Sequence, residues 1–290
     1  PNVCSGDNYG ILKVDGQVGR VIRWEKSIND WSSVINITNT EMTQEYNNLI
    51  ETTKYRAIIK SGVCSDSPSS DITINVDAES SGGAITTTAS NTCLGDNEGL
   101  LVVNGQIGNV VRWEKTIDDW GTVVSIPGTE STQDYINLDK TTKYRVIIKS
   151  GVCSQAISNE AVINVDPISV GGQVKTLTSN VCSGNNSGEL TVTGQTGSIV
   201  RWEKTTDDWN TITSIENTKS SQDYSNLYET TKYRAVMQSG VCLPATSNEA
   251  VITVDPLSAG GTVTASSSSV CSGVNEGTLA LSGHSGNIIR

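Results

Sequence analysis

The sequence has no phenylalanine, one histidine and only two methionines. Each core must therefore rest on Val, Ile, Leu, Trp and Tyr, and an apolar share of 36% allows only small cores. No apolar run approaches the ~20 residues of a membrane-spanning helix, so we expect no membrane insertion of this segment. Basic residues are outnumbered 20 to 31 by acidic ones, for a net charge of −11. Since nucleic-acid binding needs Lys and Arg to neutralise phosphates, we expect no nucleic-acid partner.

Catalytic and metal-binding motifs are also missing. There is no G-x-S-x-G, H-E-x-x-H, P-loop or G-x-G-x-x-G element, and no C-x-x-C pair. The single histidine, His284, stands where other parts of the chain have glutamine. We therefore expect neither an enzyme nor a cofactor or metal site. Calcium at the recurring Asp77, Asp166 and Asp255 is the alternative, but calcium needs about six to eight oxygen ligands and no dense acidic loop supplies them.

What the chain does have is an internal repeat. Cys4, Cys93, Cys182 and Cys271 are each 89 residues apart, and so are Cys64, Cys153 and Cys242. The tryptophans of the R-W-E-K motif follow the same period. A unit of 89 residues is large enough to bury its own core, unlike the short units of a solenoid. The chain is thus a tandem array of domains.

One segment of each unit is predicted with particular clarity as a strand. Thr141–Cys153 has the sequence TTKYRVIIKSGVC and recurs almost unchanged at Thr52–Cys64 and Thr230–Cys242. Tyr144, Val146 and Ile148 alternate with Arg145, Ile147 and Lys149, the period-2 pattern of a strand with one buried face.

About seven such strands per unit, spaced by roughly 8–12 residues, predict a tandem immunoglobulin-like β-sandwich. In immunoglobulin lettering the strands contain Ala84 (A), Leu101 (B), Trp113 (C), Val123 (C′), Tyr135 (E), Tyr144 (F) and Ile163 (G), with a turn-rich segment Asn91–Gly99 before strand B. Alternation places Val111 and Trp113 inside, and Arg112 and Glu114 outside. A tryptophan on strand C and a tyrosine opening strand F fit the buried tryptophan and tyrosine corner of that fold. The predicted core residues are therefore Trp24, Trp113, Trp202, Tyr55, Tyr144 and Tyr233.

Short linkers such as VDPISVGG, stiffened in two places by proline, separate the units. We expect a repeat lacking its first strand at 1–77 (repeat 1), complete repeats at 82–166 (repeat 2) and 171–255 (repeat 3), and a partial repeat at 260–290 with strands A, B and the start of C. The chain is thus predicted to be a window of a longer polypeptide.

The outer face of the C–F pair carries Arg112, Glu114 and Arg145, which predicts a cross-strand Arg–Glu ladder. A carbohydrate platform on this face would need an exposed aromatic ring, and Trp120 with its equivalents Trp31 and Trp209 is the candidate. A partly buried tryptophan at the strand edge is the favoured interpretation.

Two fixed cysteine positions per unit in a Ser/Thr-rich array favour disulfides in an oxidising compartment. Counting alone favours Cys4–Cys64, Cys93–Cys153 and Cys182–Cys242.

In an immunoglobulin sandwich, however, the A–B and F–G turns lie at opposite ends, and a strand of about seven residues spans roughly 23 Å. A disulfide needs its Cα atoms within about 7 Å. We therefore favour bridges between neighbouring repeats, Cys4–Cys153 and Cys93–Cys242, with the alternative left open. Cys64, Cys182 and Cys271 would then have partners outside this window or none.

The run VCSGNNSGELTVTGQTGSIVRWEK (181–204), with NLYETTKYRAVMQSGVC (226–242) and SNEAVITVDP (247–256), resembles the Ig-like repeats of giant Bacteroidota surface adhesins, the SprB-like proteins of gliding flavobacteria. The resemblance covers the whole chain. It implies type IX secretion, an extracellular location at the cell surface, and the stalk of an adhesin or filament active in attachment and gliding motility. Partners would be neighbouring repeats, other copies in a filament, or a surface polysaccharide or substratum. An array of carbohydrate-binding modules is the alternative function.

Overall fold

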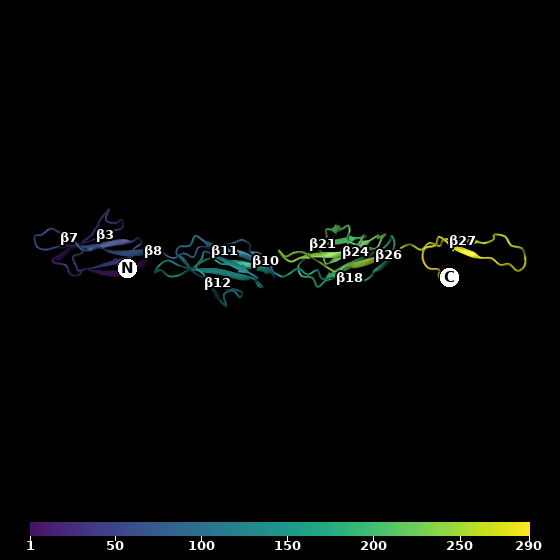
Figure 1. Ribbon diagram of the computed structural model, residues 1–290, viewed down its shortest axis with the longest axis horizontal. Helices are drawn as coiled ribbons and strands as arrows, with labels where there is room; N and C mark the ends of the chain where they lie inside the picture. Colours follow the sequence, from purple (N-terminus) through teal and green to yellow (C-terminus); the bar gives the residue numbers. More distant parts are fainter. The chain divides into compact units, whose positions relative to one another are not determined.

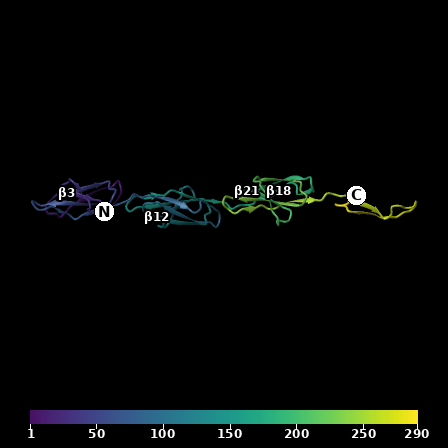
Figure 2. The same ribbon diagram turned by 90° about the horizontal axis from the view of Figure 1, so that it is seen from above.

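The computed structural model describes residues 1–290 and contains strands and no helices. Figure 1 and, in a perpendicular view, Figure 2 show the strands of each repeat running lengthwise through it. The strands of repeat 2 are β9 (Ala84–Thr87), β10 (Asn91–Cys93), β11 (Glu98–Asn104), β12 (Asn109–Thr116), β13 (Val124–Ile126), β14 (Thr132–Ile136), β15 (Thr142–Lys149), β16 (Ala156–Ile157) and β17 (Ala161–Asp166). They form two sheets, β14-β11-β9 and β10-β17-β15-β12-β13, while β16 pairs with β15 beyond the end of β17.

Repeat 3 has the same topology. Its strands are β18 (Gln173–Thr176), β19 (Asn180–Cys182), β20 (Ser187–Thr193), β21 (Ser198–Thr205), β22 (Thr213–Ile215), β23 (Ser221–Ser225), β24 (Thr231–Gln238), β25 (Ala245–Thr246) and β26 (Ala250–Asp255). The partial repeat forms only a two-stranded sheet of β27 (Thr262–Ala265) and β28 (Leu279–Ser282).

Repeat 1 has the larger sheet complete and the smaller one incomplete. Its strands are β1 (Asn2–Cys4), β2 (Tyr9–Lys13), β3 (Arg20–Ser27), β4 (Ile35–Ile37), β5 (Thr43–Asn47), β6 (Thr53–Lys60), β7 (Ser67–Pro68) and β8 (Ile72–Asp77). The larger sheet runs β1-β8-β6-β3-β4, and β2 pairs with β5 alone. The E-B-A and A′-G-F-C-C′ strand orders of repeats 2 and 3 define immunoglobulin-like β-sandwiches, as the sequence predicts.

The core of repeat 2 lies between its two sheets. Leu101, Trp113 and Ile163 are fully buried, and Tyr144 is 2% exposed. The indole N–H of Trp113 donates a hydrogen bond to the carbonyl of Glu130 at 3.1 Å, which satisfies the only polar atom of this ring. The other residues predicted for the core are also buried: Trp24, Trp202, Tyr55 and Tyr233.

Tyr144 is a core residue but does not form a tyrosine corner. Its ring packs against Tyr135, with centroids 6.4 Å apart, and burial raises its pKa to about 12. The hydroxyl that donates to a backbone carbonyl is that of Tyr135, which bonds to Ala89 at 3.2 Å.

Three side chains on strands C and F differ in position or in burial from what alternation predicts. A β-bulge between Val110 and Arg112 shifts the register of β12, so Val110 is buried and Val111 is 36% exposed. The prediction that Val111 faces inward is therefore wrong, because a bulge adds one residue to the alternation. Glu114 and Ile147 do point outward, yet they are only 4% and 3% exposed. Neighbouring side chains cover this face of the sheet.

The segment before strand B is more ordered than predicted. Its first residues form β10, an edge strand beside β17. In repeat 1 the equivalent β1 runs parallel to β8, with Cys4 opposite Asp77, the last residue of that strand. Three residues are too few for a periodic pattern, so sequence alone predicts only a turn here. This strand fixes Cys4 at the end of the sandwich from which the linker leaves.

Candidate functional site

Repeats 1 and 2 are joined by a disulfide and by hydrogen bonds to the linker between them. A disulfide joins Cys4, at the end of β1, to Cys153, in the turn after β15, with the Cα atoms 4.9 Å apart. The two residues are 149 positions apart in the sequence. The bridge therefore connects one repeat to the next. It agrees with the predicted pairing Cys4–Cys153 and not with the pairing Cys4–Cys64 within one repeat, which counting alone favours.

The linker aspartate binds the same turn. The carboxylate of Asp77 accepts a hydrogen bond from the backbone N–H of Val152 at 2.9 Å. Gly151 has φ +47°, and a Cβ at this position would lie 1.9 Å from Asp77 Oδ2. Glycine is thus required here for its backbone conformation and for the close approach of the carboxylate. A second linker residue, Ser80, accepts the N–H of Ser150 at 2.9 Å.

The linker then passes directly into strand A. A Cβ on Gly82 would lie 2.0 Å from the carbonyl oxygen of Ile157, so the chain crosses β16 in close contact. The side-chain oxygen of Asn159 accepts the N–H of Ile85 at 2.6 Å. Linker, F–G turn and strand A therefore form one continuous contact, which we call the joint.

The linker of repeat 3 makes the same contacts with its own domain. Asp166 accepts the N–H of Val241 at 3.0 Å, and Ser169 accepts that of Ser239 at 2.9 Å. Gly240 again has φ +47°. The recurrence shows that the joint is a property of the repeat sequence.

These contacts give the linker aspartates a role that sequence reasoning missed. Asp77 is a hydrogen-bond acceptor for the turn of the next repeat, whereas the sequence analysis considered this residue only as an alternative calcium ligand. The chain contains no group of three or more His, Cys, Asp or Glu side chains arranged to hold a metal ion. A usable signal was present: Ser80, Ser169 and Ser258 recur three residues after the three linker aspartates.

The remaining cysteines fall into two groups. Cys93 and Cys242 are disulfide-bonded, while Cys64, Cys182 and Cys271 are exposed free thiols. The histidine singled out in the sequence, His284, is exposed in the partial repeat.

The outer face of strands β12 and β15 carries the predicted ladder. Arg145 donates to Glu114 Oε2 at 2.7 Å, and Arg112 donates to Oε1 at 2.8 Å. Burial alone raises the pKa of Glu114, but the hydrogen bonds from the two arginines outweigh it and hold this pKa below its usual value. Repeats 1 and 3 have the same arrangement around Glu25 and Glu203.

Trp120 covers this ladder. The guanidinium carbon of Arg145 lies 3.9 Å from the centroid of the Trp120 ring, and the indole N–H donates to Glu160 at 2.6 Å. Lys143 pairs with both Asp119 and Glu160. The ring is half-buried. One of its faces is occupied by an arginine of its own domain, so a sugar could stack only on the other.

A strained turn presents this ring. Asp119 and Trp120 have φ values of +55° and +68°, a region that non-glycine residues rarely adopt. The Thr116 hydroxyl donates to Asp118 and accepts the N–H of Trp120. Hydrogen bonds from Thr116 and Thr122 lower the pKa of Asp118 to about 2. The left-handed turn recurs in all three repeats, so the tryptophan is held over the ladder by a conformation that costs free energy.

The structure contains no helix that is long and apolar enough to cross a membrane.

The fold and the joint together define a tandem array of immunoglobulin-like β-sandwich domains with structured linkers. Residues 1–78, 81–167 and 170–256 each match one family model, described as a domain of unknown function, DUF8696. The chain belongs to this family.

Solved structures provide two further comparisons. One is entitled "Structural insight into host cell surface retention of a 1.5-MDa bacterial ice-binding adhesin"; it is 14% identical, with a TM-score of 0.41, and the match covers 88% of this chain and 94% of that one. The other contains the FN1–FN3 domains of chicken CNTN1, at 13% identity and a TM-score of 0.32, covering 86% and 95%. No curated protein matches the chain.

Proposed function

We propose that the chain is part of the stalk of a secreted, repetitive cell-surface adhesin or filament. The observation that carries this proposal is the joint. Each linker that we describe is bound by its neighbouring domain, and Cys4–Cys153 crosses from one repeat to the next. A chain of domains held in this way transmits position and force along its length, which a stalk requires and an isolated binding module does not.

Two further observations support secretion. Disulfides persist in oxidising compartments and are rare in the cytosol, and the structure has four disulfide-bonded cysteines. The motifs quoted above resemble those of giant gliding adhesins, which supports display at the cell surface, type IX secretion and a part in gliding motility. Attachment would take place at a tip domain or through many weak contacts along the array.

The test of the stalk is the stiffness of the joint. Small-angle scattering of the whole chain, before and after reduction, should show greater bending between repeats 1 and 2 once Cys4–Cys153 is broken. The double variant C4S/C153S should show this greater bending without reduction, and C64S, which removes only an exposed free thiol, should behave like the wild type. Identical scattering of C4S/C153S and wild type would refute a stiffening role.

The location and the biological role need intact cells. Antibodies raised against the chain should label unpermeabilised cells of the source bacterium, and labelling only after permeabilisation would exclude a surface stalk. Deletion of the repeats should impair attachment to a surface and gliding over it.

The alternative, an array of carbohydrate-binding modules, would have to use the free side of Trp120, because Arg145 covers the other. Glycan-array binding that is saturable and is lost when Trp31, Trp120 and Trp209 are all replaced by alanine would establish it, with Tyr9→Ala, which removes an exposed ring of repeat 1, as the control.

A further inference from the structure

Repeat 3 has a pocket between its C–C′ hairpin and its E–F turn. The volume of this pocket is about 260 Å³. One wall comes from β21, β22 and the loop between them, and the other from residues 226–231, which lead from β23 into β24. All of the lining residues belong to repeat 3, so one domain forms the whole pocket.

The pocket is lined mainly by polar side chains. Lys204 and Glu229 contribute one positive and one negative charge, which cancel. The aliphatic lining residue is Leu227, and the aromatic one is Tyr228, which is 73% exposed. Five further lining residues are threonines: Thr205, Thr206, Thr211, Thr213 and Thr231.

This polar character is specific to repeat 3. Tyr228 stands where repeats 1 and 2 have Ile50 and Asp139. Thr206 and Thr213 put hydroxyls in the place of alkyl groups, because the other two repeats have aliphatic residues at these positions: Ile28, Ile117, Ile35 and Val124. The surrounding strands keep their R-W-E-K and T-T-K-Y-R motifs in all three repeats. Three exchanges that meet at one pocket therefore distinguish repeat 3 from its neighbours.

Two apolar surfaces in the pocket are open to a ligand. Leu227 is half-buried, whereas the equivalent Leu49 and Leu138 are 8% and 7% exposed. Threonine is shorter than isoleucine, so the exchanges uncover this leucine. The ring of Tyr228 lies near Gly184, where a Cβ would be 3.8 Å from its Cε1, and is otherwise mostly exposed. A ligand that covers both surfaces removes apolar area from water, which favours binding.

The polar groups of the pocket have free hydrogen-bonding capacity. The hydroxyls of Thr206, Thr213 and Tyr228 make no hydrogen bond within the protein, and Lys204 and Glu229 form no ion pair. A hydroxyl both donates and accepts hydrogen bonds, a lysine ammonium donates and a carboxylate accepts. The pocket thus offers donors and acceptors to the same ligand.

The next repeat of the array does not cover this place. In repeat 1, which is joined to the complete repeat 2, the equivalent Ile28, Ile35 and Ile50 are 53%, 49% and 71% exposed. The strand order of the larger sheet in repeat 3 is β19-β26-β24-β21-β22. The pocket adjoins β21 and β22, whereas the cysteine position of the joint is at the end of β19, on the opposite edge. A pocket here therefore stays open along the array.

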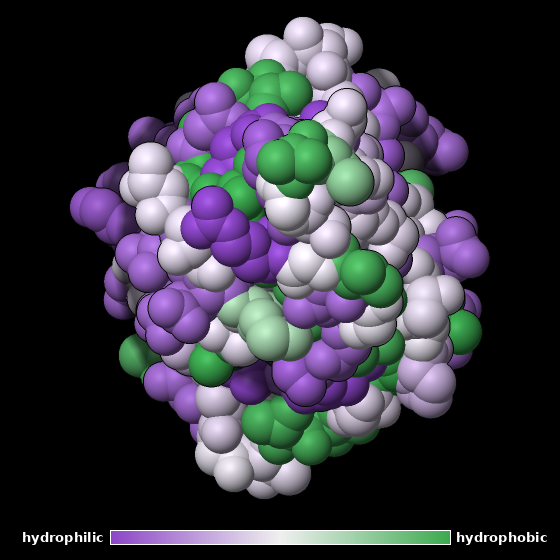
Figure 3. Space-filling model, turned by 90° about the vertical axis from the view of Figure 1, so that its left-hand side faces the viewer, coloured by the Kyte–Doolittle hydropathy of each residue, from purple (hydrophilic) through white to green (hydrophobic).

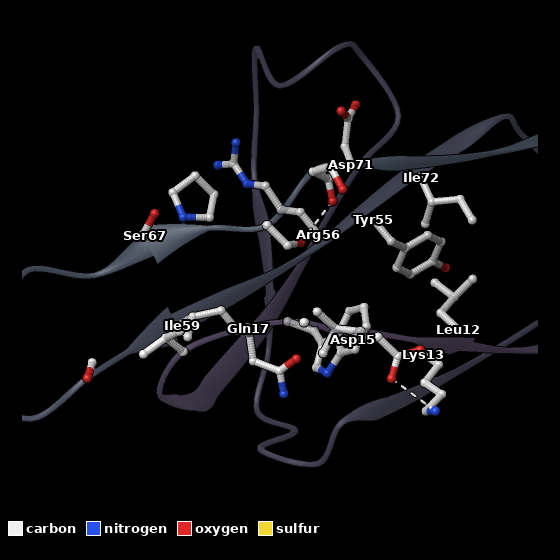
Figure 4. A pocket seen from close by; sticks show the side chains of 18 of the residues that line it. Leu12, Lys13, Asp15, Gln17, Tyr55, Arg56, Ile59, Ser67, Asp71 and Ile72 are labelled. Carbon is white, nitrogen blue, oxygen red and sulfur yellow. Dashed lines mark hydrogen bonds and ion pairs between the residues drawn. The ribbon is translucent and has the colours of Figure 1, made fainter.

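Two other surface features are not ligand sites. Figure 3, an end view, shows small separate apolar patches among polar residues and no broad docking face. In repeat 1, Leu12 and Gln17 face Asp71 and Ile72 across a cavity of about 800 Å³ (Figure 4). In repeat 2 strand β9 pairs with β11 at the equivalent place, so this cavity corresponds to strand A and not to a ligand.

We propose that the pocket of repeat 3 binds one neutral sugar ring, the terminal hexose of a glycan. Its volume lies just below the roughly 300–1,000 Å³ of sites for drug-sized ligands, which suits a single ring. Sugar hydroxyls donate and accept hydrogen bonds as the threonine hydroxyls do. The apolar C–H face of the sugar would stack on Tyr228, whose side chain combines an apolar ring with a polar tip. A neutral ligand fits because the charges of Lys204 and Glu229 cancel.

The site is distinct from the tryptophan platform considered above. Trp209 does not line the pocket. A platform on this ring would recur in every repeat, whereas the pocket depends on exchanges found in repeat 3 alone. The inference goes beyond the stalk function and does not depend on it, because scattering tests the stalk and sugar titration tests the pocket.

The test is a titration of the full chain with the methyl glycosides of glucose, galactose, mannose and N-acetylglucosamine, followed by NMR. A ligand of about a dozen non-hydrogen atoms reaches a Kd of about 1–3 mM at ordinary ligand efficiency, so the titration extends to about 20 mM. At least one glycoside should shift the methyl signals of Thr206 and Thr213 saturably, while signals of the tryptophan rings stay unchanged.

Variants that restore the residues of the other repeats should abolish the site without unfolding the domain. Thr206→Ile combined with Thr213→Val, as in repeat 2, should weaken binding at least tenfold, and so should Tyr228→Ile, as in repeat 1. Thr218→Ile, at an exposed position outside the pocket, is the matched control and should bind like the wild type. Unchanged signals from the strands of repeat 3 show that each variant is folded.

Four results would overturn the proposal. None of the four glycosides could shift the pocket signals, or Thr218→Ile could weaken binding as much as the pocket variants. The shifts could appear at the tryptophans of all three repeats instead, which would favour the platform. Sodium acetate or glycine could shift the pocket signals while no glycoside does, which would make the pocket a site for a charged ligand.

Discussion

Trp113 and Trp120, seven residues apart, have different structural roles. Trp113 fills the core and is fully buried, while Trp120 lies on the outer face over Arg145. The sequence predicts the first from alternation on strand C. It gives no sign that the second stacks on an arginine, because a stacked pair depends on a turn conformation and not on a period.

Replacement of the two tryptophans by alanine should therefore have unequal effects. Trp113→Ala should lower the free energy of unfolding of repeat 2 by about 3–5 kcal/mol, the usual cost of emptying a large core site. Trp120→Ala should cost clearly less, since it loses a half-buried ring and a cation–π contact of about 0.5–2 kcal/mol. Urea unfolding of residues 82–166 measures both, and equal losses would contradict the assignment.

Glu114 should make repeat 2 sensitive to acid. Its pKa in the folded protein lies below the ordinary 4.5 because its arginine hydrogen bonds outweigh burial. The carboxylate therefore contributes stability that is present above pH 4.5 and is lost as the pH falls through the lower folded value. Glu114→Gln should reduce stability at pH 7 by about 1.5–3 kcal/mol, the range for hydrogen bonds to charged groups, and flatten the acid side of the profile. Glu98→Gln, at an exposed position of β11, is the control and should change neither.

At the scale of the element, regular alternation predicts most strands but not their irregularities. The core positions on strands B, F and G follow from period 2, and Leu101, Tyr144 and Ile163 are buried as predicted. Val111 does not follow it because of the bulge in β12. Ile147 is buried although it points away from the core, because the sheet's outer face is covered as well. Bulges and covered outer faces depend on contacts between strands, which one strand's sequence does not contain.

The linker is the element whose structure was least predictable. Asp77 binds a turn 75 residues further along the chain, and no local pattern specifies such a partner. Asp77→Ala should leave the sandwiches folded but expose the Val152 amide, so its hydrogen exchange should become at least tenfold faster. Glu79→Ala, an exposed neighbour in the same linker, should not change it. Unaltered Val152 exchange in Asp77→Ala would show that the carboxylate does not hold the turn.

At the scale of the whole molecule, we expect residues 82–166 to fold alone. The core cluster of repeat 2 draws only on residues from Ile85 to Val165. Circular dichroism of this fragment should show a β spectrum and one cooperative thermal transition. Residues 260–290 should be unfolded by the same measure, since they form a single two-stranded sheet. A fragment 82–166 without a cooperative transition would place the domain boundaries elsewhere.

The pairing of Cys93 is the remaining question of connectivity. Loop entropy does not decide between candidates, because closing about 149 residues instead of about 60 changes this contribution by only about 0.8 kcal/mol. The prediction rests on the equivalence of positions in successive repeats. Cys93 ends β10 as Cys4 ends β1, and Cys242 follows β24 as Cys153 follows β15, where it lies beside the linker carbonyls of Asp166 and Pro167. If the joint repeats along the chain, Cys93 pairs with Cys242.

Non-reducing peptide mapping should therefore yield Cys4–Cys153 and Cys93–Cys242 peptides, with Cys64, Cys182 and Cys271 open to alkylation at low protein concentration. A Cys93–Cys153 peptide from native protein would mean that the bridges close within repeats, and the joint would lose the covalent link on which its stiffness depends.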